Sequence, residues 1–109
     1  MKVFHIAVDL SNEIDSLTNA FPSKEKFSLL SQIKRAADSV VLNIAEGSTG
    51  QTIPEYKRFL NISLRSAIEV VAALYLAFKR NYITEEQHKK LYADYEMLVK
   101  MITKLRNSL

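Results

Sequence analysis

Apolar residues recur at alternating intervals of three and four along almost the whole chain, which is the spacing of residues on one face of an α-helix. The pattern runs in four segments, and it predicts helices over about residues 3–20, 24–46, 53–80 and 85–108. Four helices with short connections predict an all-α fold. We expect an antiparallel up-down-up-down four-helix bundle that forms a single domain over residues 1–109.

Local signals mark where these helices begin and end. Thr52 with Glu55, and Thr84 with Gln87, each fit a capping box, in which a hydroxyl and an amide or carboxylate side chain satisfy free backbone amides. Gly47 is expected to end the second helix as a C-terminal cap.

The main apolar stripe of each segment is expected to face the core. In the second segment this stripe begins at Phe27, and Leu29 lies outside it. The residues predicted to be buried within one chain include Leu30, Ile33, Val40, Leu74, Leu98 and Ile102.

The second and third segments carry more apolar residues than one buried face requires. A bundle of this size has no interior large enough to cover two faces of two helices, and an exposed apolar stripe is typical of a subunit interface. We therefore predict a homo-oligomer. The interface candidates are Leu42, Leu64, Ile68, Val71 and Tyr75. The alternative is a wide core seam with some exposed apolar residues.

Composition limits the location of the protein. The chain has no cysteine, which excludes disulfides and thiolate metal sites and fits a reducing compartment. The longest apolar stretch, residues 67–78, is interrupted by Glu69 and is shorter than a membrane span. We expect a cytoplasmic protein with no membrane segment.

Catalytic residues do not form any recognisable constellation in the sequence. Glu85 and His88 have the spacing of one half of a di-metal motif, but such a site needs two pairs of this kind and two further carboxylates. A glycine-rich phosphate loop is also missing. We expect no enzyme activity, no cofactor and no metal site.

Four polar residues interrupt the apolar stretches of the second and third segments. They are Arg35, Asn43, Glu46 and Glu69. The two carboxylates could form an acid/base pair, although such groups more often satisfy one another in a structural network. Arg35 and Glu69 fall at similar heights if the two helices are antiparallel, so we expect them to be in contact or in one polar network.

The net charge of +3 is a weak positive field that permits nucleic-acid contact without requiring it. Long cationic side chains outside the apolar stripes suit contacts to phosphate. The candidates for nucleic-acid binding are Lys57, Arg58, Arg65, Lys79, Arg80, Lys89, Lys90, Lys100 and Lys104. The alternative is an ordinary solvated surface, because no recognition helix or aromatic stacking motif stands beside them.

The run from residue 32 to residue 47, which ends in Asn-Ile-Ala-Glu-Gly, resembles the signature of the 23S rRNA intervening-sequence proteins. The Phe-Pro pair at residues 21–22 with Glu25, the residues 55–60, and Ser66 with Glu69 extend this resemblance over nearly the whole chain.

Several expectations come from this resemblance alone. It implies a homopentameric four-helix bundle, and some members of the family are encoded inside intervening sequences of bacterial ribosomal RNA genes. The accessory protein of diversity-generating retroelements is similar in fold and assembly, and it binds nucleic acid and a reverse transcriptase. The implied partners are therefore further copies of the chain, RNA or DNA, and a reverse transcriptase or another protein.

The resemblance also assigns structural roles to signature positions. These are Arg35, Asn43, Glu46, Ser66 and Glu69. The chain departs from the family pattern at Gly50, Leu64 and Arg65. Taken together, the sequence predicts a non-catalytic, homo-oligomeric bundle that serves as a nucleic-acid-binding or ribonucleoprotein accessory. The competing class is a protein–protein interaction scaffold with no nucleic-acid role.

Overall fold

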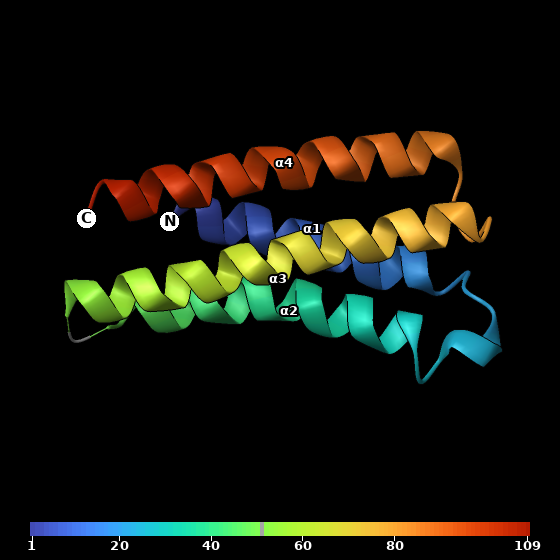
Figure 1. Cartoon of the computed structure of the whole chain (residues 1–109), viewed down its shortest axis with the longest axis horizontal. Coiled ribbons are helices and arrows are strands. Elements are labelled where there is room, and N and C mark those ends of the chain that lie inside the picture. Colours follow the sequence, from blue (N-terminus) through green and yellow to red (C-terminus); the bar gives the residue numbers. More distant parts are fainter. Residues whose placement is uncertain (51) are drawn as a thin grey trace.

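A computed structural model describes residues 1–50 and 52–109. The chain forms α1 (Lys2–Thr18), a short 3-10 helix η1 (Ser23–Glu25), α2 (Leu29–Ser48), α3 (Ile53–Lys79) and α4 (Glu85–Asn107). Figure 1 shows the four long helices lying along the long axis of the molecule, each running opposite to the one before it. The expected all-α fold is confirmed, and the described residues contain no strand.

One hydrophobic core takes side chains from all four helices. Ile14, Ile33, Leu74 and Leu98 are completely buried in it. Of the six residues predicted for the core, five are buried and Leu30 is only half-buried. The core position in that turn belongs instead to its neighbour Leu29, which is 2% exposed.

Leu29 and Leu30 lie four and three residues before the buried Ile33, so helical spacing permits either to face the core, and α2 also starts later than the sequence suggested. The backbone of Ser28 is non-helical (φ −128°, ψ −103°), so the helix begins at Leu29 and not near residue 24. Phe27, which was expected in the apolar stripe, lies before the helix and is 90% exposed. The hydroxyl of Ser28 donates a 2.6 Å hydrogen bond to the carboxylate of Glu25, which ties this break to η1.

Helices α2 and α3 make the closest contact of the bundle, and Gly47 permits it. A Cβ atom at Gly47 would lie 2.9 Å from Cδ1 of Tyr56 and 3.1 Å from Cβ of Phe59. The expectation that Gly47 ends α2 as its C-terminal cap is wrong, because α2 continues to Ser48, its cap residue is Thr49, and no described glycine has a positive φ. The missing side chain serves helix–helix packing.

The starts of α3 and α4, and the turn between these helices, follow the local sequence. Thr84 and Gln87 form the predicted capping box in both directions. Thr52 accepts a 3.2 Å hydrogen bond from the Glu55 amide at the start of α3. The turn itself is closed by Asn81, whose φ of 63° is a conformation that asparagine tolerates better than most residues.

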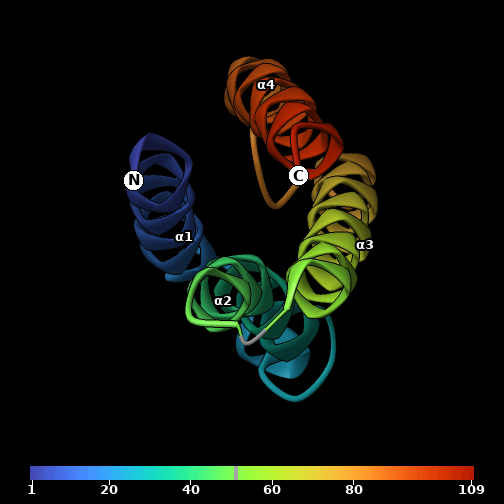
Figure 2. The ribbon, with the colours of Figure 1, turned by 90° about the vertical axis from the view of Figure 1, so that its left-hand side faces the viewer.

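Helix α3 is more apolar than its buried face requires. Among the described residues it alone is long and apolar enough to cross a membrane, by a test of length and composition that core helices of soluble proteins also pass. Only 39% of its most apolar window is buried within the chain. Figure 2 looks along the bundle and shows α3 between α2 and α4, with its remaining side turned outward.

Candidate nucleic-acid interface

The charges of the protein are divided unevenly between the two halves of the bundle. We call residues 1–8, 41–64 and 97–109 the terminal half, because it contains both chain ends (Figure 1). The remaining residues, 9–40 and 65–96, form the hairpin half, which contains the α3–α4 turn. The terminal half has six Lys and Arg residues against two carboxylates, and the hairpin half has nine against ten. The whole positive excess of the chain therefore lies in the terminal half.

The salt bridges are also distributed unevenly between the two halves. Lys34–Asp15, Arg80–Glu25, Lys89–Glu85, Lys90–Glu13 and Lys90–Asp94 are the salt bridges found in the described part of the chain. All of them lie in the hairpin half. Within residues 1–50 and 52–109, no cation of the terminal half is paired with a carboxylate.

The cations of the terminal half come from three helices that meet at this end. Lys2 of α1 and Lys104 of α4 line one hollow of about 430 Å³ between their helices. On the α3 side, Arg106 donates a 2.9 Å hydrogen bond to the side-chain oxygen of Asn61. Lys57 is one helical turn from Asn61 on the same face of α3. A neutral partner such as Asn61 leaves the charge of Arg106 uncompensated.

Two more cations complete the terminal group. Arg58 is exposed, and its guanidinium lies 4.5 Å from the centre of the Phe59 ring, a contact that orients the side chain without neutralising it. Lys100 is exposed on α4. Four of the nine predicted nucleic-acid residues, Lys57, Arg58, Lys100 and Lys104, thus lie together at this end. Arg65 is exposed near the middle of α3.

The other four predicted cations lie in the hairpin half, where three of them, Arg80, Lys89 and Lys90, form salt bridges. Lys90 forms salt bridges with both Glu13 and Asp94, and Lys89 forms one with Glu85 at 3.0 Å. The carboxylates of Asp94 and Glu13 raise the pKa of Lys90 above its usual value. Lys79 lies 5.8 Å from the Tyr75 ring centre. The nine residues predicted to bind nucleic acid therefore do not form a single continuous surface.

Arg80 takes part in a polar cluster around the buried Glu25, and the sequence did not reveal this cluster. The carboxylate of Glu25 accepts hydrogen bonds from Ser28, from Arg80 at 3.1 Å and from the hydroxyl of Tyr82 at 2.7 Å. The hydrogen bonds from Ser28 and Tyr82 lower the pKa of Glu25 to about 2. The cluster fixes η1 to the α3–α4 turn, with the Phe21 ring 5.4 Å from that of Tyr82. In the sequence, the only sign of this cluster was the position of Glu25, a carboxylate three residues after Pro22.

The predicted polar network is only partly present. Ser39 and Ser66 share a 2.8 Å hydrogen bond between α2 and α3, and Asn43 donates to the hydroxyl and the carbonyl of Ser39. The expected contact between Arg35 and Glu69 is wrong: both are exposed, and no salt bridge joins them in the described part of the chain. The polar contact between the two helices is made by Ser39 and Ser66 instead.

Glu46, the remaining member of the proposed network, is exposed at the terminal end of α2. The serine pair could not be predicted from charge patterning, because it depends on the close approach of α2 and α3. Ser63 adds to the same contact by donating a 2.9 Å hydrogen bond to the Val40 carbonyl.

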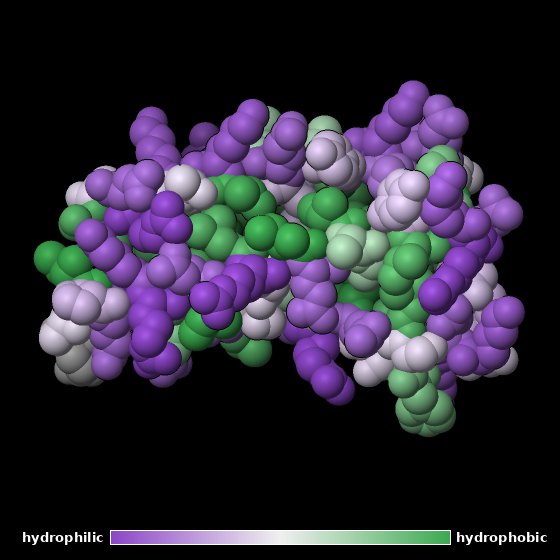
Figure 3. All heavy atoms as spheres, viewed as in Figure 1, coloured by the Kyte–Doolittle hydropathy of each residue, from purple (hydrophilic) through white to green (hydrophobic). Residues whose placement is uncertain are grey.

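An apolar band follows the outer line between α3 and α4. It consists of Leu64, Ile68, Val71 and Tyr75 of α3 with Tyr92 and Val99 of α4. Ile68 is 62% exposed and Tyr75 is 50% exposed. Figure 3 shows apolar side chains gathered along this line. Leu42, the fifth interface candidate, is 65% exposed but lies on α2, beside a different groove that Val8 of α1 also lines.

Aromatic rings cluster at the hairpin end of this band. The rings of Phe78 and His88 are stacked, with centroids 4.8 Å apart, and Tyr75 and Tyr92 lie beside His88. This grouping was not expected from the sequence, because its members come from two helices whose register was unknown. No group of three or more His, Asp or Glu side chains that could hold a metal occurs among the described residues.

Comparison with known proteins places this chain in a family. The sequence matches the 23S rRNA-intervening sequence protein family over residues 1–104. It is also similar to a protein of unknown function from the S23 ribosomal protein family of Bacteroides thetaiotaomicron, known from a crystal structure at 1.70 Å resolution. The two are 27% identical, with a TM-score of 0.88 over 95% of this chain and 97% of the other. No curated protein is similar enough to count as a relative. The match over nearly the full length shows that the chain belongs to the 23S rRNA-intervening sequence protein family.

Proposed function

We propose that the protein is a non-catalytic, homo-oligomeric accessory that binds RNA or DNA in the cytoplasm through the terminal half of the bundle. The observation that carries this proposal is the group of six cations at that end, none of which is paired with a carboxylate in the described residues. Phosphate binding releases counterions in proportion to the number of free cations that reach the backbone, so unpaired lysines and arginines contribute most.

This proposal narrows the set of binding residues. Lys57, Arg58, Lys100 and Lys104 are the residues that we propose contact phosphates. Lys89 and Lys90 would first have to give up their carboxylate partners, and Arg80 would have to leave Glu25. Phosphate contacts position a nucleic acid without reading its bases, so binding should depend little on sequence.

Assembly would strengthen the attraction. The apolar band is the surface that we propose is covered by a second copy of the chain, because contiguous apolar surface of this kind commonly marks an interface. A ring must close to avoid open-ended polymerisation. With the pentameric stoichiometry implied by the family resemblance, a charge of +3 per chain becomes about +15 per particle, and several weak contacts act together.

A protein–protein interaction scaffold is the second candidate function, and the apolar band favours it. If no second copy covers Ile68 and Tyr75, these exposed side chains offer a surface to a different protein, for which a reverse transcriptase is one candidate. In that case the cations of the terminal half would serve solubility alone.

Two measurements separate these functions. Light scattering at micromolar concentration should show several chains per particle. A mobility-shift titration with structured RNA and with duplex DNA at about 50 mM salt should show binding that weakens steeply as salt rises. A strict monomer contradicts the homo-oligomer. No retention of either nucleic acid at tens of micromolar protein, on the order of the weakest non-specific affinities, contradicts the nucleic-acid role and favours the scaffold.

A further inference from the structure

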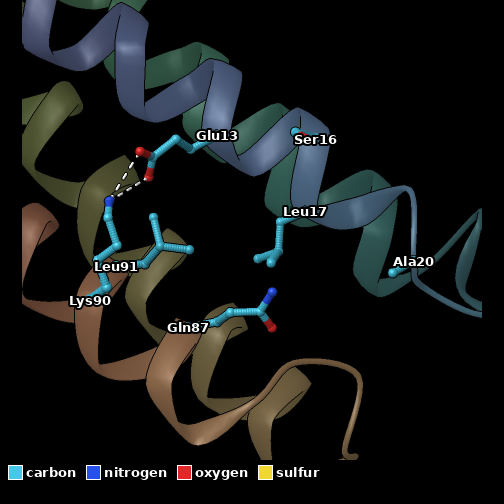
Figure 4. A pocket seen from close by; sticks show the side chains of 7 residues that line it. All are labelled: Glu13, Ser16, Leu17, Ala20, Gln87, Lys90 and Leu91. Atoms are coloured by element: carbon cyan, nitrogen blue, oxygen red, sulfur yellow. Dashed lines mark hydrogen bonds and ion pairs between the residues drawn. The ribbon is translucent and has the colours of Figure 1, made fainter.

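The seam between α1 and α4 is the least filled contact of the bundle. Helix α1 packs mainly against α2 and only lightly against α4. In the hairpin half, a hollow of about 370 Å³ opens between α1 and α4. Figure 4 shows Leu17 and Leu91 pointing into this space from the two helices. The seam is therefore an apolar groove with room for side chains that the chain itself does not supply.

The sequence explains why the seam stays open. Beside Leu17, this wall of the hollow is lined by Ser16 of α1 and by Ala20, which follows α1, and both side chains are too small to reach across. At the inner end of the hollow the two helices are joined only by Lys90, whose ammonium lies 3.0 Å from both carboxylate oxygens of Glu13. A bundle position filled by Leu would have closed this space.

The rim of the hollow is acidic. Glu13 and Asp94 both bind Lys90. Asp9 lies four residues before Glu13, and Glu86 lies four residues before Lys90, so helical spacing puts each on the same face as its neighbour. Glu13 and Asp94 are already paired with Lys90, whereas Asp9 and Glu86 form no salt bridge within residues 1–50 and 52–109. This charge repels the phosphates that the terminal half attracts, so nucleic acid does not suit this surface.

The hollow runs along a helix. Its α1 wall extends from Glu13 to Leu17, and Ala20 continues the wall after α1 ends at Thr18. Helices commonly enter such grooves with apolar side chains spaced three and four residues apart.

We propose that this hollow is the docking site for a basic amphipathic helix of a partner protein. Its leucine-like side chains enter between Leu17 and Leu91, and its lysine or arginine side chains pair with Asp9 and Glu86, the two carboxylates that Lys90 does not already bind. The site lies on a different surface from the proposed nucleic-acid interface, so it does not depend on that function.

A synthetic helix tests the proposal directly. The probe is a fluorescein-labelled peptide of about 18 residues with Leu at helical spacing and Lys elsewhere, and its counterpart carries Glu in place of Lys. Fluorescence anisotropy with the full-length protein should show binding of the Lys peptide and at least roughly tenfold weaker binding of the Glu peptide. Equal affinity for both peptides would overturn the acidic-groove assignment.

Matched variants localise the binding. Ser16→Arg/Ala20→Arg fills the hollow and opposes the peptide charge, whereas Ser48→Arg/Ala93→Arg adds the same charge at exposed positions elsewhere. The first variant should weaken binding about tenfold and the second should leave it nearly unchanged. Circular dichroism confirms that both are folded. Equal weakening by the two variants would show a non-specific charge effect.

Methyl NMR provides a readout that does not depend on mutation. On titration with the Lys peptide, the methyl signals of Leu17 and Leu91 should shift before those of Leu64 and Ile68. Shifts confined to Leu64 and Ile68 would place the peptide on the apolar band and overturn the proposal.

Discussion

The two halves of the bundle share one core but treat their charged residues in opposite ways. In the hairpin half, cations and carboxylates are nearly equal in number, and several are joined across helices, as in Lys34–Asp15 and Lys90–Glu13. In the terminal half, cations outnumber carboxylates and reach neutral partners or solvent. A modest net charge on the whole chain therefore conceals one neutralised region and one with unbalanced positive charge.

The charged residues therefore have different roles in the two halves of the bundle. Pairing in the hairpin half fixes the position of η1 and of the α3–α4 turn, through Glu25 and Arg80. Exposed salt bridges add little stability, so the other pairs chiefly remove charge from the surface. The terminal half is held by apolar packing, with Gly47 against Tyr56, and by hydrogen bonds such as that from Arg106 to Asn61, so no carboxylate occupies its cations in the described residues.

The largest expected change in stability comes from substitutions in the hydrophobic core that the two halves share. Leu98 and Ile33 are fully buried, so Leu98→Ala or Ile33→Ala leaves a cavity and should cost roughly 2–5 kcal/mol. Because one core runs through both halves, thermal melting should remain a single transition. Melting of either variant within a degree or two of the parent would mean that the two halves do not depend on this core.

A smaller effect is expected from packing in the terminal half. In Gly47→Ala the new Cβ meets the Tyr56 ring and the Phe59 Cβ, and the overpacking should cost roughly 1–3 kcal/mol. Chemical denaturation measures the loss, and Ser48→Ala, at an exposed neighbouring position, is the control. Equal stability of the two variants would show that α2 and α3 can separate without cost.

The smallest stability effect concerns the hairpin half and depends on pH. Glu25 has a folded-state pKa of about 2 against an ordinary value of 4.5, so the unfolded chain takes up a proton first. Its contribution is present above pH 4.5 and is lost as the pH falls from there towards 2. The parent should therefore lose more melting temperature over this range than Glu25→Gln. Parallel pH profiles for the two proteins would show that the hydrogen bonds to Glu25 do not hold η1 in place.

Much of this architecture could be predicted from the sequence, because helical spacing and capping are local signals. The four segments, the Thr84–Gln87 box and core residues such as Ile33 and Leu98 followed from them. The start of α2 could not, because it depends on the bonds that Glu25 makes with Arg80 and Tyr82, more than fifty residues away. Helical spacing alone extended the stripe back to Phe27.

The candidate site was predictable only as a set of residue types. Spacing placed Lys57 and Lys90 equally outside the apolar stripes, but it could not show that one is unpaired and the other holds two carboxylates. Arg35 and Glu69 failed as a pair for a related reason. Equal height along two helices does not fix the direction of their side chains, and Ser39 and Ser66 occupy the contact instead.

The measurement that tests the central claim most directly compares the two halves at constant charge. One variant replaces Lys57, Arg58, Lys100 and Lys104 with Gln, and its match replaces Lys34, Lys79, Lys89 and Lys90 with Gln, leaving Arg80 to hold Glu25. Each loses four positive charges, and affinity for duplex DNA is followed over a range of salt concentrations.

We predict that the first variant loses at least roughly tenfold in affinity at about 50 mM salt, and that its salt dependence falls by about one unit of slope for each phosphate contact removed. The matched variant should stay close to the parent. Equal losses from the two variants, or a larger loss from the second, would contradict the assignment of nucleic-acid binding to the terminal half.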